Sequence, residues 1–174
     1  MGSKEATAQD VQVTMKGDPV TLIGRIPEVG DQAPDAVLHK NDLSETRISD
    51  HLGQSQVLIL TVPSLDTSVC DQEVRRFNEA AADLPNTKVL VVSMDLPFSQ
   101  ERWCAAAGIE NVETLSDHAR ADFGEAYGVL IEGLRLLTRT IFVVDPKGTI
   151  RYREIVSEIT NQPDFDAALE AARA

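Results

Sequence analysis

A strand–loop–helix pattern in the middle of the chain constrains the fold more than any other feature. Val57–Val62 is an almost wholly apolar run, which is typical of a strand buried on both faces of a sheet. Pro63 ends this strand, because proline cannot donate a hydrogen bond to a sheet ladder. Residues 66–68, Asp-Thr-Ser, favour a helix N-cap, and Val69–Asp83 then repeats apolar residues with a helical period. Cys70 is therefore expected in the first turn of a helix.

This position predicts a reactive thiol at Cys70 rather than a cysteine that only packs in the core. The first turn of a helix has unpaired backbone N–H groups and the positive end of the helix dipole. Both favour the thiolate, which is the reactive form of cysteine. Asp71 and Glu73 oppose the thiolate through their charge, although acidic residues also stabilise the first turn of any helix.

A thiolate in this place needs a cation nearby, and the helix itself does not supply one. Arg75 and Arg76 follow Cys70 by five and six positions, so both should lie on other helix faces and in solvent. Arg139 opens the apolar strand Arg139–Val144 and is the first candidate from elsewhere in the chain. Arg135 is the second, and the spacing alone does not choose between them.

The rest of the chain alternates strand and helix patterns around this centre. Val11–Lys16 and Pro19–Ile23 both alternate with period two and flank a turn at Gly17-Asp18, so they predict an N-terminal β-hairpin. Ser116-Asp117 is expected to cap the helix that follows it, and Pro163 to take the first helical position of the last helix. Further strands are expected over Ala36–His39, Leu43–Ile48, Lys88–Ser93, Val112–Leu115, Arg139–Val144 and Thr149–Val156, and further helices over Ser99–Ala107, His118–Tyr127 and Asp164–Ala172. This order predicts an α/β fold with a central mixed sheet.

Length and composition limit the organisation and the partners of the chain. With 174 residues, one domain is expected over residues 11–174, after a small polar stretch at residues 1–10 that reads as a flexible tail. A net charge of −12 argues against nucleic acid and anionic membranes as partners. No stretch approaches the length of a membrane span, and residues 1–10 have no hydrophobic run and so are not expected to be a signal peptide; a cytoplasmic location is expected.

The cysteine and histidine inventory makes a metal site improbable. Cys70 and Cys104 are the only two cysteines and are widely separated, which excludes a Cys-x-x-Cys motif and a zinc cluster. The three histidines, at positions 39, 51 and 118, show no ligand spacing. No metal and no cofactor is expected.

Beyond these patterns, the sequence resembles a known family. Pro63-x-x-x-Thr67-x-x-Cys70 is similar to the peroxiredoxin active-site motif, and the string Pro-Ser-Leu-Asp-Thr-Ser-Val-Cys at residues 63–70 resembles that of the thiol peroxidase subfamily. These are atypical two-cysteine peroxiredoxins. Further similar stretches are Gly17–Leu22, Val74–Asn78, Phe98–Cys104, Asn111–Asp117, Ile159-Thr160 and Pro163–Phe165. The resemblance covers nearly the whole chain and implies a thioredoxin-like fold.

The resemblance also implies a role for each matching residue. Cys70 would be the peroxidatic cysteine, whose thiolate attacks a hydroperoxide and becomes a sulfenic acid. Thr67 would hydrogen-bond the sulfur and the peroxide, and Pro63 would shield the pocket from water. Arg139 would stabilise the thiolate and the charge that develops on the peroxide. Together, Thr67 and Arg139 would bind the substrate.

Cys104 would be the resolving cysteine, which condenses with the Cys70 sulfenic acid to an intramolecular Cys70–Cys104 disulfide. Because a disulfide needs Cα atoms within about 7 Å, we expect the Ser99–Gly108 helix to unwind locally when it forms. The family implies thioredoxin as the reductant and a homodimer as the assembly. Apolar residues near the motif would favour organic hydroperoxides over hydrogen peroxide; they are Leu65, Val69, Trp103 and Leu134. A peroxide-sensing relay that oxidises a partner protein, and a binding module without catalysis, are the alternative interpretations.

Overall fold

The computed structural model describes residues 11–174, so the predicted flexible tail at residues 1–10 lies outside the described residues. In chain order the elements are β1 (Val13–Met15), β2 (Asp18–Val20), β3 (Leu22–Ile23), β4 (Val37–His39), β5 (Glu45–Arg47), the 3₁₀-helix η2 (Ile48–His51), β6 (Gln56–Thr61), α1 (Ser68–Ala81), β7 (Thr87–Ser93), α2 (Pro97–Ala107), β8 (Glu113–Ser116), α3 (Asp122–Ala126), β9 (Leu130–Ile131), β10 (Thr140–Val144), β11 (Ile150–Ile155) and α4 (Phe165–Arg173).

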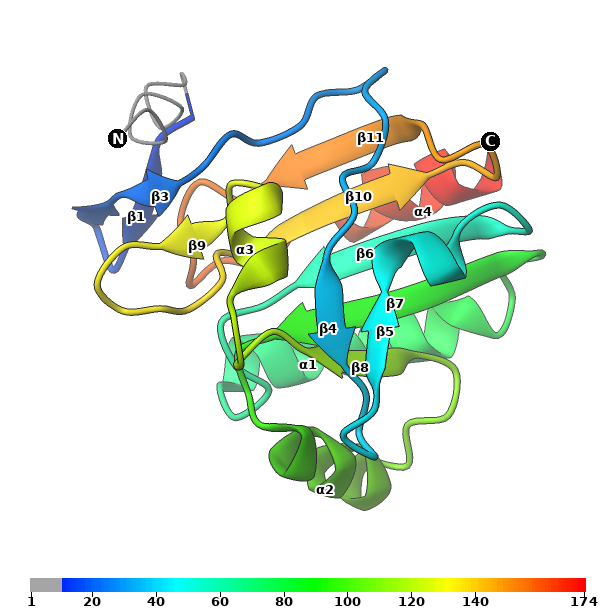
Figure 1. Ribbon diagram of the computed structural model, residues 1–174, viewed down its shortest axis with the longest axis horizontal. Coiled ribbons are helices and arrows are strands. Elements are labelled where there is room, and N and C mark those ends of the chain that lie inside the picture. The colour runs from blue at the N-terminus through cyan, green and yellow to red at the C-terminus, as the bar shows by residue number, and fades with distance from the viewer. Residues whose placement is uncertain (1–10) are drawn as a thin grey trace.

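A seven-stranded mixed sheet forms the centre of the molecule, in the order β11-β10-β6-β7-β8-β4-β5 (Figure 1). The pairs β6–β7 and β7–β8 are parallel, whereas β10 runs antiparallel to both β6 and β11. The apolar run that follows Gln56 is buried throughout, because β6 has neighbours on both edges and layers on both faces. The predicted α/β fold with a central mixed sheet flanked by helices is confirmed.

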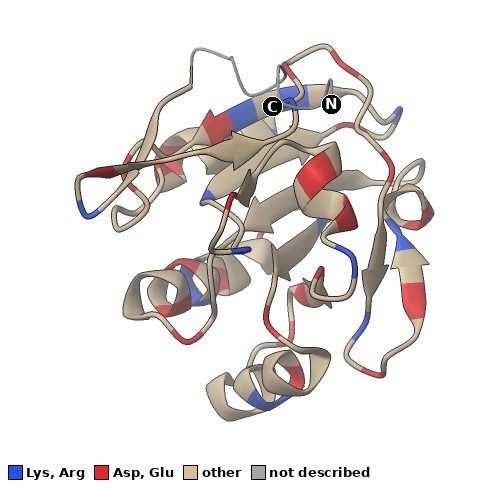
Figure 2. Ribbon diagram, turned by 60° about the vertical axis from the view of Figure 1, so that its left-hand side comes forward, with Lys and Arg blue, Asp and Glu red and all other residues tan. Residues whose placement is uncertain are grey.

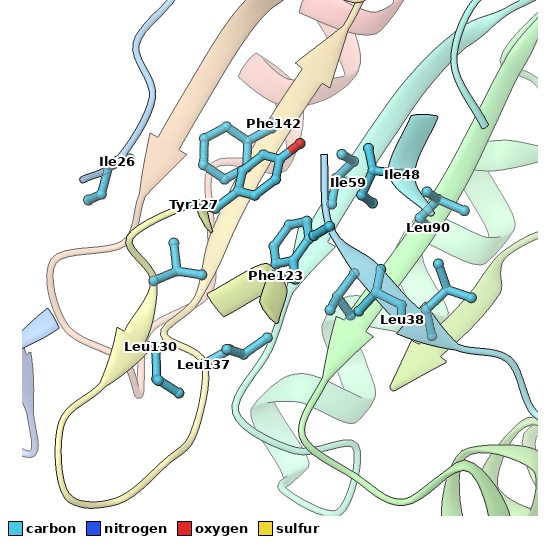
Figure 3. Packing of buried hydrophobic residues seen from close by; sticks show 14 of the residues in the cluster. Ile26, Leu38, Ile48, Ile59, Leu90, Phe123, Tyr127, Leu130, Leu137 and Phe142 are labelled. Atoms are coloured by element: carbon cyan, nitrogen blue, oxygen red, sulfur yellow. The ribbon is translucent and has the colours of Figure 1, made fainter. Parts of the chain in front are cut away.

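Alternate residues of the central strands build two separate cores. On one face, Leu58 and Leu60 of β6 pack with Val74 and Phe77 of α1 and with α4. On the other face, the intervening side chains pack with Phe123 of α3, with Tyr127 directly after that helix, and with the segment around β4 and η2 (Figure 3). This division follows from the two-residue period of a strand, which sends successive side chains to opposite faces.

The register between β6 and β10 brings two distant parts of the sequence together. Thr140, the first residue of β10, pairs with Thr61, the last residue of β6. Because the strands are antiparallel, the residue before β10 lies beside the loop that follows β6. The sheet itself therefore places Arg139 next to the loop that leads to Cys70.

The N-terminal hairpin exists, but its turn lies one residue earlier than predicted. Met15 of β1 pairs with Asp18 of β2, so the turn residues are Lys16 and Gly17, with φ of 51° and 86°. Two positive φ values define the type I′ turn that suits the twist of a hairpin, and Gly17 adopts its value without strain. The second predicted arm is also split, since β3 leaves the hairpin and pairs with β9 instead.

Helix α1 begins one residue before its predicted start, at Ser68, and the other three helix starts also differ from the predictions. The helix expected over His118–Tyr127 begins only at Asp122, because the chain first turns through Ala121 with φ of 54°. The predicted cap still acts there, since the Asp117 carboxylate accepts hydrogen bonds from the N–H groups of Phe123 and Gly124. Helix α2 starts earlier than expected, with a proline as its first residue.

The last helix, α4, begins after its predicted proline. The N-cap is Asp164, whose side chain accepts from the N–H of Ala167. Pro163 therefore precedes the cap and is not the first helical residue. An aspartate at the N-cap accepts a hydrogen bond from a helical N–H that would otherwise be unpaired. This cap sets the start of α4 at Phe165.

The Glu158 carboxylate fastens the N-terminal hairpin to the rest of the structure, beside backbone hydrogen bonds at Thr14. Glu158 accepts hydrogen bonds from Thr14 Oγ1 (2.7 Å), from the N–H groups of Lys16 and Gly17 (2.9 and 3.0 Å), and from Thr160. These donors hold the pKa of Glu158 far below its usual range, with the Thr14 hydroxyl as the largest cause. The ionised form is therefore the one that the folded state stabilises.

Replacing Glu158 with glutamine should lower the melting temperature at pH 7. A lowered pKa in the folded state adds stability above the ordinary carboxyl pKa of 4.5 and loses it as the pH falls through the folded value. The difference between wild type and Glu158→Gln should thus be largest near neutrality and narrow below pH 4.5. Thermal unfolding followed by circular dichroism between pH 3 and pH 8 measures this difference in melting temperature. A difference that does not change with pH would contradict the role of the Glu158 charge.

Candidate active site

Cys70 is buried in the first turn of α1, just beyond the carboxyl end of β6. Thr67 is the N-cap, and its hydroxyl accepts a hydrogen bond from the N–H of Cys70 at 3.2 Å. The Thr67 hydroxyl also donates to the carbonyl of Ser64 at 3.3 Å. The hydroxyl thus fixes the backbone of the turn that carries the cysteine. Pro63, between the strand and this loop, is buried.

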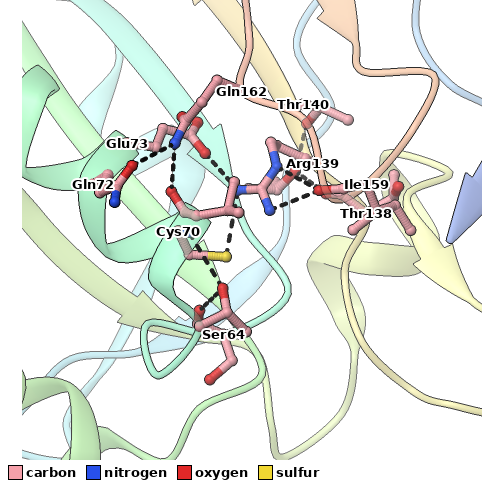
Figure 4. Close-up of polar contacts among 12 residues, drawn as sticks. Ser64, Cys70, Gln72, Glu73, Thr138, Arg139, Thr140, Ile159 and Gln162 are labelled. Carbon is pink, nitrogen blue, oxygen red and sulfur yellow. Dashed lines mark hydrogen bonds and ion pairs between the residues drawn. The ribbon is translucent and has the colours of Figure 1, made fainter. Parts of the chain in front are cut away.

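Arg139 is the cation beside the sulfur. It is 1 % exposed, and its Nη1 donates to Cys70 Sγ at 3.3 Å (Figure 4). Its Nε and Nη2 both donate to the carbonyl of Ile159, at 2.9 and 2.8 Å. Arg135, the alternative considered from sequence, is exposed, as are Arg75 and Arg76.

Glu73 completes this buried group, and the sequence did not predict its part in it. Arg139 Nη1 lies 2.6 Å from Glu73 Oε1, and both side chains are almost fully buried. Burial raises the pKa of Glu73 to about 7, and the charge of Arg139 opposes that rise. The sequence carried one signal for this contact, since Glu73 follows Cys70 by three positions and so shares its helix face.

Two acidic groups, the Cys70 thiol and the Glu73 carboxyl, therefore contact one guanidinium. Arg139 contacts the sulfur and the carboxylate through the same Nη1 atom, while the second carboxylate oxygen of Glu73 has no partner among the described residues. Negative charge on Cys70 and on Glu73 thus competes for one cation. An arginine suits this task because its planar fork keeps several donors in fixed directions.

A loop from the carboxyl end of the chain covers the first turn of α1. Gln162 Nε2 donates to the carbonyl of Val69 at 3.1 Å, and Ile159 in the same loop accepts from Arg139. The hairpin supports this loop, since the N–H of Ile159 donates to the carbonyl of Thr14 at 2.8 Å. The predicted hairpin therefore braces the carbonyl that orients Arg139.

Cys104 is half-buried on α2, and neither it nor Cys70 takes part in a disulfide in this structure. Its Sγ lies 3.6 Å from Thr114 Oγ1, and burial raises the pKa of the Cys104 thiol. Of the α2 residues, only Pro97 and Gln100 are buried. Helix α2 is therefore held to the body by few groups.

The apolar residues predicted near the site have different surroundings. Leu65 belongs to the same core cluster as Cys70, and Trp103 packs against that cluster. Val69 is half-buried, whereas Leu134 is 52 % exposed. Within residues 11–174, no group of His, Cys, Asp and Glu side chains is arranged to hold a metal ion.

A buried cysteine beside a buried arginine, at the end of a central strand of a thioredoxin-like sheet, defines a thiol-dependent redox protein. The sequence profile of the Redoxin family matches residues 28–169 of this chain. The thiol peroxidase of Oceanobacillus iheyensis is 55 % identical, over 90 % of this chain and 95 % of that protein. The thiol peroxidase of Bacillus subtilis is 52 % identical, over 94 % of this chain and 97 % of that protein.

Solved structures agree with these relatives. A peroxiredoxin-like protein from Aquifex aeolicus superimposes with a TM-score of 0.86 at 42 % identity, covering 93 % of this chain and 95 % of that one. A thiol peroxidase from Chromobacterium violaceum gives a TM-score of 0.84 at 25 % identity, with the same coverage of both chains. The chain belongs to the redoxin family and, within it, to the thiol peroxidase subfamily of the peroxiredoxins. It is a peroxidase, an oxidoreductase, as the motif predicted.

Proposed function

We propose that this protein reduces hydrogen peroxide and organic hydroperoxides to water and alcohols, with Cys70 as the nucleophile, Cys104 as the resolving cysteine and thioredoxin as the reductant. One observation carries the proposal: the 3.3 Å contact between Arg139 Nη1 and the buried Cys70 Sγ. A guanidinium in a site without water stabilises both a thiolate and an oxygen on which negative charge develops.

In the first step, the Cys70 thiolate attacks one oxygen of the hydroperoxide. A sulfur–oxygen bond forms, the oxygen–oxygen bond breaks, and the other oxygen leaves with the electron pair and takes up a proton as water or alcohol. Cys70 becomes a sulfenic acid. Arg139 stabilises the leaving charge, Thr67 and Arg139 bind the peroxide, and Pro63 limits the access of water.

In the second step, the Cys104 thiolate attacks the sulfenic sulfur, and the Cys70–Cys104 disulfide forms as the hydroxyl leaves as water. Cys104 lies on a different helix from Cys70, so α2 must unwind or move before the sulfurs meet. The thin packing of α2 supports this step, since Pro97 and Gln100 alone among its residues are buried.

In the third step, the two thiols of reduced thioredoxin exchange with the disulfide and restore both cysteines. Such recycling fits the reducing conditions of the cytoplasm, where we place the reaction.

Among the described residues no helix is long and apolar enough to cross a membrane. Acidic residues are spread over helices and loops rather than gathered on one face (Figure 2).

We also propose a homodimer and a single domain over residues 11–174. Leu96 and Phe98, at the start of α2, are 50 % and 66 % exposed. Exposed apolar side chains of this size offer contact surface to a second copy. The association state can be measured by sedimentation at several protein concentrations.

Replacing Cys104 with serine tests the resolving role. The variant should consume one peroxide per Cys70 and then stall, because the sulfenic acid has no thiol to condense with in its own chain. Excess peroxide should carry Cys70 on to higher oxides. Peroxide consumption with thioredoxin present, together with mass spectrometry of the Cys70 peptide, measures this.

Two results would contradict the proposal. Sustained turnover of Cys104→Ser with thioredoxin would remove Cys104 from the cycle. Wild-type protein that oxidises another protein faster than it consumes peroxide with thioredoxin would favour the sensing relay instead.

A further inference from the structure

One carboxylate connects the loop before Cys70 with the segment that leads to the Cys104 helix. Asp95 lies between β7 and α2 and is half-buried. Its Oδ1 accepts from Ser64 Oγ at 2.7 Å, and its Oδ2 accepts from the N–H of Leu65 at 2.8 Å. Its Oδ2 also accepts from Ser93 Oγ, at 2.8 Å. Two of these three donors belong to the loop that follows β6.

The same chain of hydrogen bonds continues into α2. Ser93 Oγ accepts from Gln100 Nε2 at 3.0 Å, and Gln100 Nε2 donates further to the carbonyl of Leu115 at 2.9 Å. The Ser93 hydroxyl can do both, since it has one proton to donate and two lone pairs to accept. Gln100 is buried and is one of the residues that anchor α2 against the sheet. The path from Ser64 to Gln100 therefore passes only through Asp95 and Ser93.

We propose that Asp95 is a positioning residue that holds both the Cys70 loop and, through Ser93 and Gln100, the Cys104 helix, so that losing its carboxylate loosens both segments. This inference rests on the proposed function, because it concerns the two steps at those cysteines. Asp95 does not touch the sulfur. It acts through Ser64 and Leu65 on one side and through Ser93 and Gln100 on the other.

The coupling has a physical reason. Attack on the peroxide needs the loop and the first turn of α1 in place, whereas disulfide formation needs α2 released. Hydrogen bonds to an ionised carboxylate are stronger than those between neutral groups. Because one carboxylate holds both segments, losing it lowers the cost of opening α2 and at the same time loosens the loop before Cys70.

The variant Asp95→Asn keeps the shape of the side chain and removes its charge and two of its acceptor lone pairs. Rapid quenching with a thiol-blocking reagent, followed by mass spectrometry, separates sulfenic acid formation from disulfide formation. In Asp95→Asn, Cys70 oxidation should slow by about threefold, and the disulfide step should quicken by about tenfold. The share of Cys70 driven to higher oxides at excess peroxide should fall accordingly.

A second variant separates coupling from general damage. Gln100→Met removes only the α2 end of the path, so it should quicken the disulfide step and leave Cys70 oxidation unchanged. In the double variant, Gln100→Met should raise the rate of the disulfide step by less than about twofold over Asp95→Asn alone. Both substitutions break the same chain of hydrogen bonds, so their effects should not add fully. Asp83→Asn, in the exposed turn that follows α1, is the matched control and should change neither step.

The outcomes distinguish this inference from the proposed function. Wild-type protein that neither consumes peroxide nor forms the disulfide would overturn the proposed function. Wild-type protein that does both, with Asp95→Asn showing wild-type rates for the two steps, would overturn the coupling alone. Fully additive effects of Asp95→Asn and Gln100→Met on the disulfide step would overturn it as well. If Asp95→Asn does not fold, Ser93→Ala cuts the same path and must quicken the disulfide step, or the coupling is wrong.

Discussion

Replacing Cys70 with serine should reduce peroxide consumption to the rate without enzyme. A hydroxyl at this position is not ionised near neutral pH, so neither the helix end nor Arg139 has a thiolate to stabilise. The measurement is loss of hydrogen peroxide, or of an organic hydroperoxide, with thioredoxin and its reductase supplied. No disulfide should appear in the variant at any peroxide concentration.

The interpretation of Cys70→Ser depends on an intact fold. Serine differs from cysteine by one atom, and the thermal unfolding curve should show that the variant remains folded at the assay temperature. Undiminished consumption of peroxide over many turnovers in Cys70→Ser would discard the assignment of the nucleophile, whatever the state of Cys104.

Replacing Arg139 with lysine should slow the oxidation of Cys70 by about 100-fold. Lysine keeps the positive charge but is not a planar fork, so it cannot reproduce the four contacts that Arg139 makes to Cys70, Glu73 and Ile159. The second-order rate of Cys70 oxidation, measured with peroxide in excess, reports the loss. The rate of the later disulfide step should change much less.

Lysine is a sharper test than an uncharged residue. Arg139→Met would leave Glu73 buried without its cation, which would raise the pKa of that carboxyl further and lower the stability of the fold. Arg135→Lys is the matched control, because Arg135 is exposed on the segment before β10 and should have no effect on the rate. If Arg135→Lys slowed the reaction and Arg139→Lys did not, the assignment of the cation would be reversed.

The local structure around Cys70 could be predicted because its causes are local. An apolar run, a proline and a set of capping residues lie within one continuous stretch, and they are enough to indicate β6, the loop and the first turn of α1. The predicted start of the helix over His118–Tyr127 was wrong for the opposite reason. Its first turn depends on Asp117, which caps Phe123 and Gly124 from a distance, and the backbone between them bends away.

Residues that act across the fold could not be assigned from the pattern. Glu73 looked like an ordinary acid of a first helical turn, yet it is fully buried against Arg139. Gln162 and Asp95 are single polar residues in loops, and polar residues in loops are usually in solvent. Their contacts depend on which loops the sheet brings to the same end, and no local period encodes that.

The choice between Arg139 and Arg135 shows the same division. Taken alone, the sequence determined that a thiol would lie in the first turn of a helix after a buried strand, and that a cation would be needed beside it. It could do so because propensity and periodicity act over a few neighbouring residues. The residue pattern left open which arginine meets the thiol, although the family resemblance implied Arg139, and only the tertiary structure showed which acid shares its charge. The antiparallel register of Thr140 with Thr61 places Arg139 beside the thiol, and such pairing arises when the whole sheet packs its two cores.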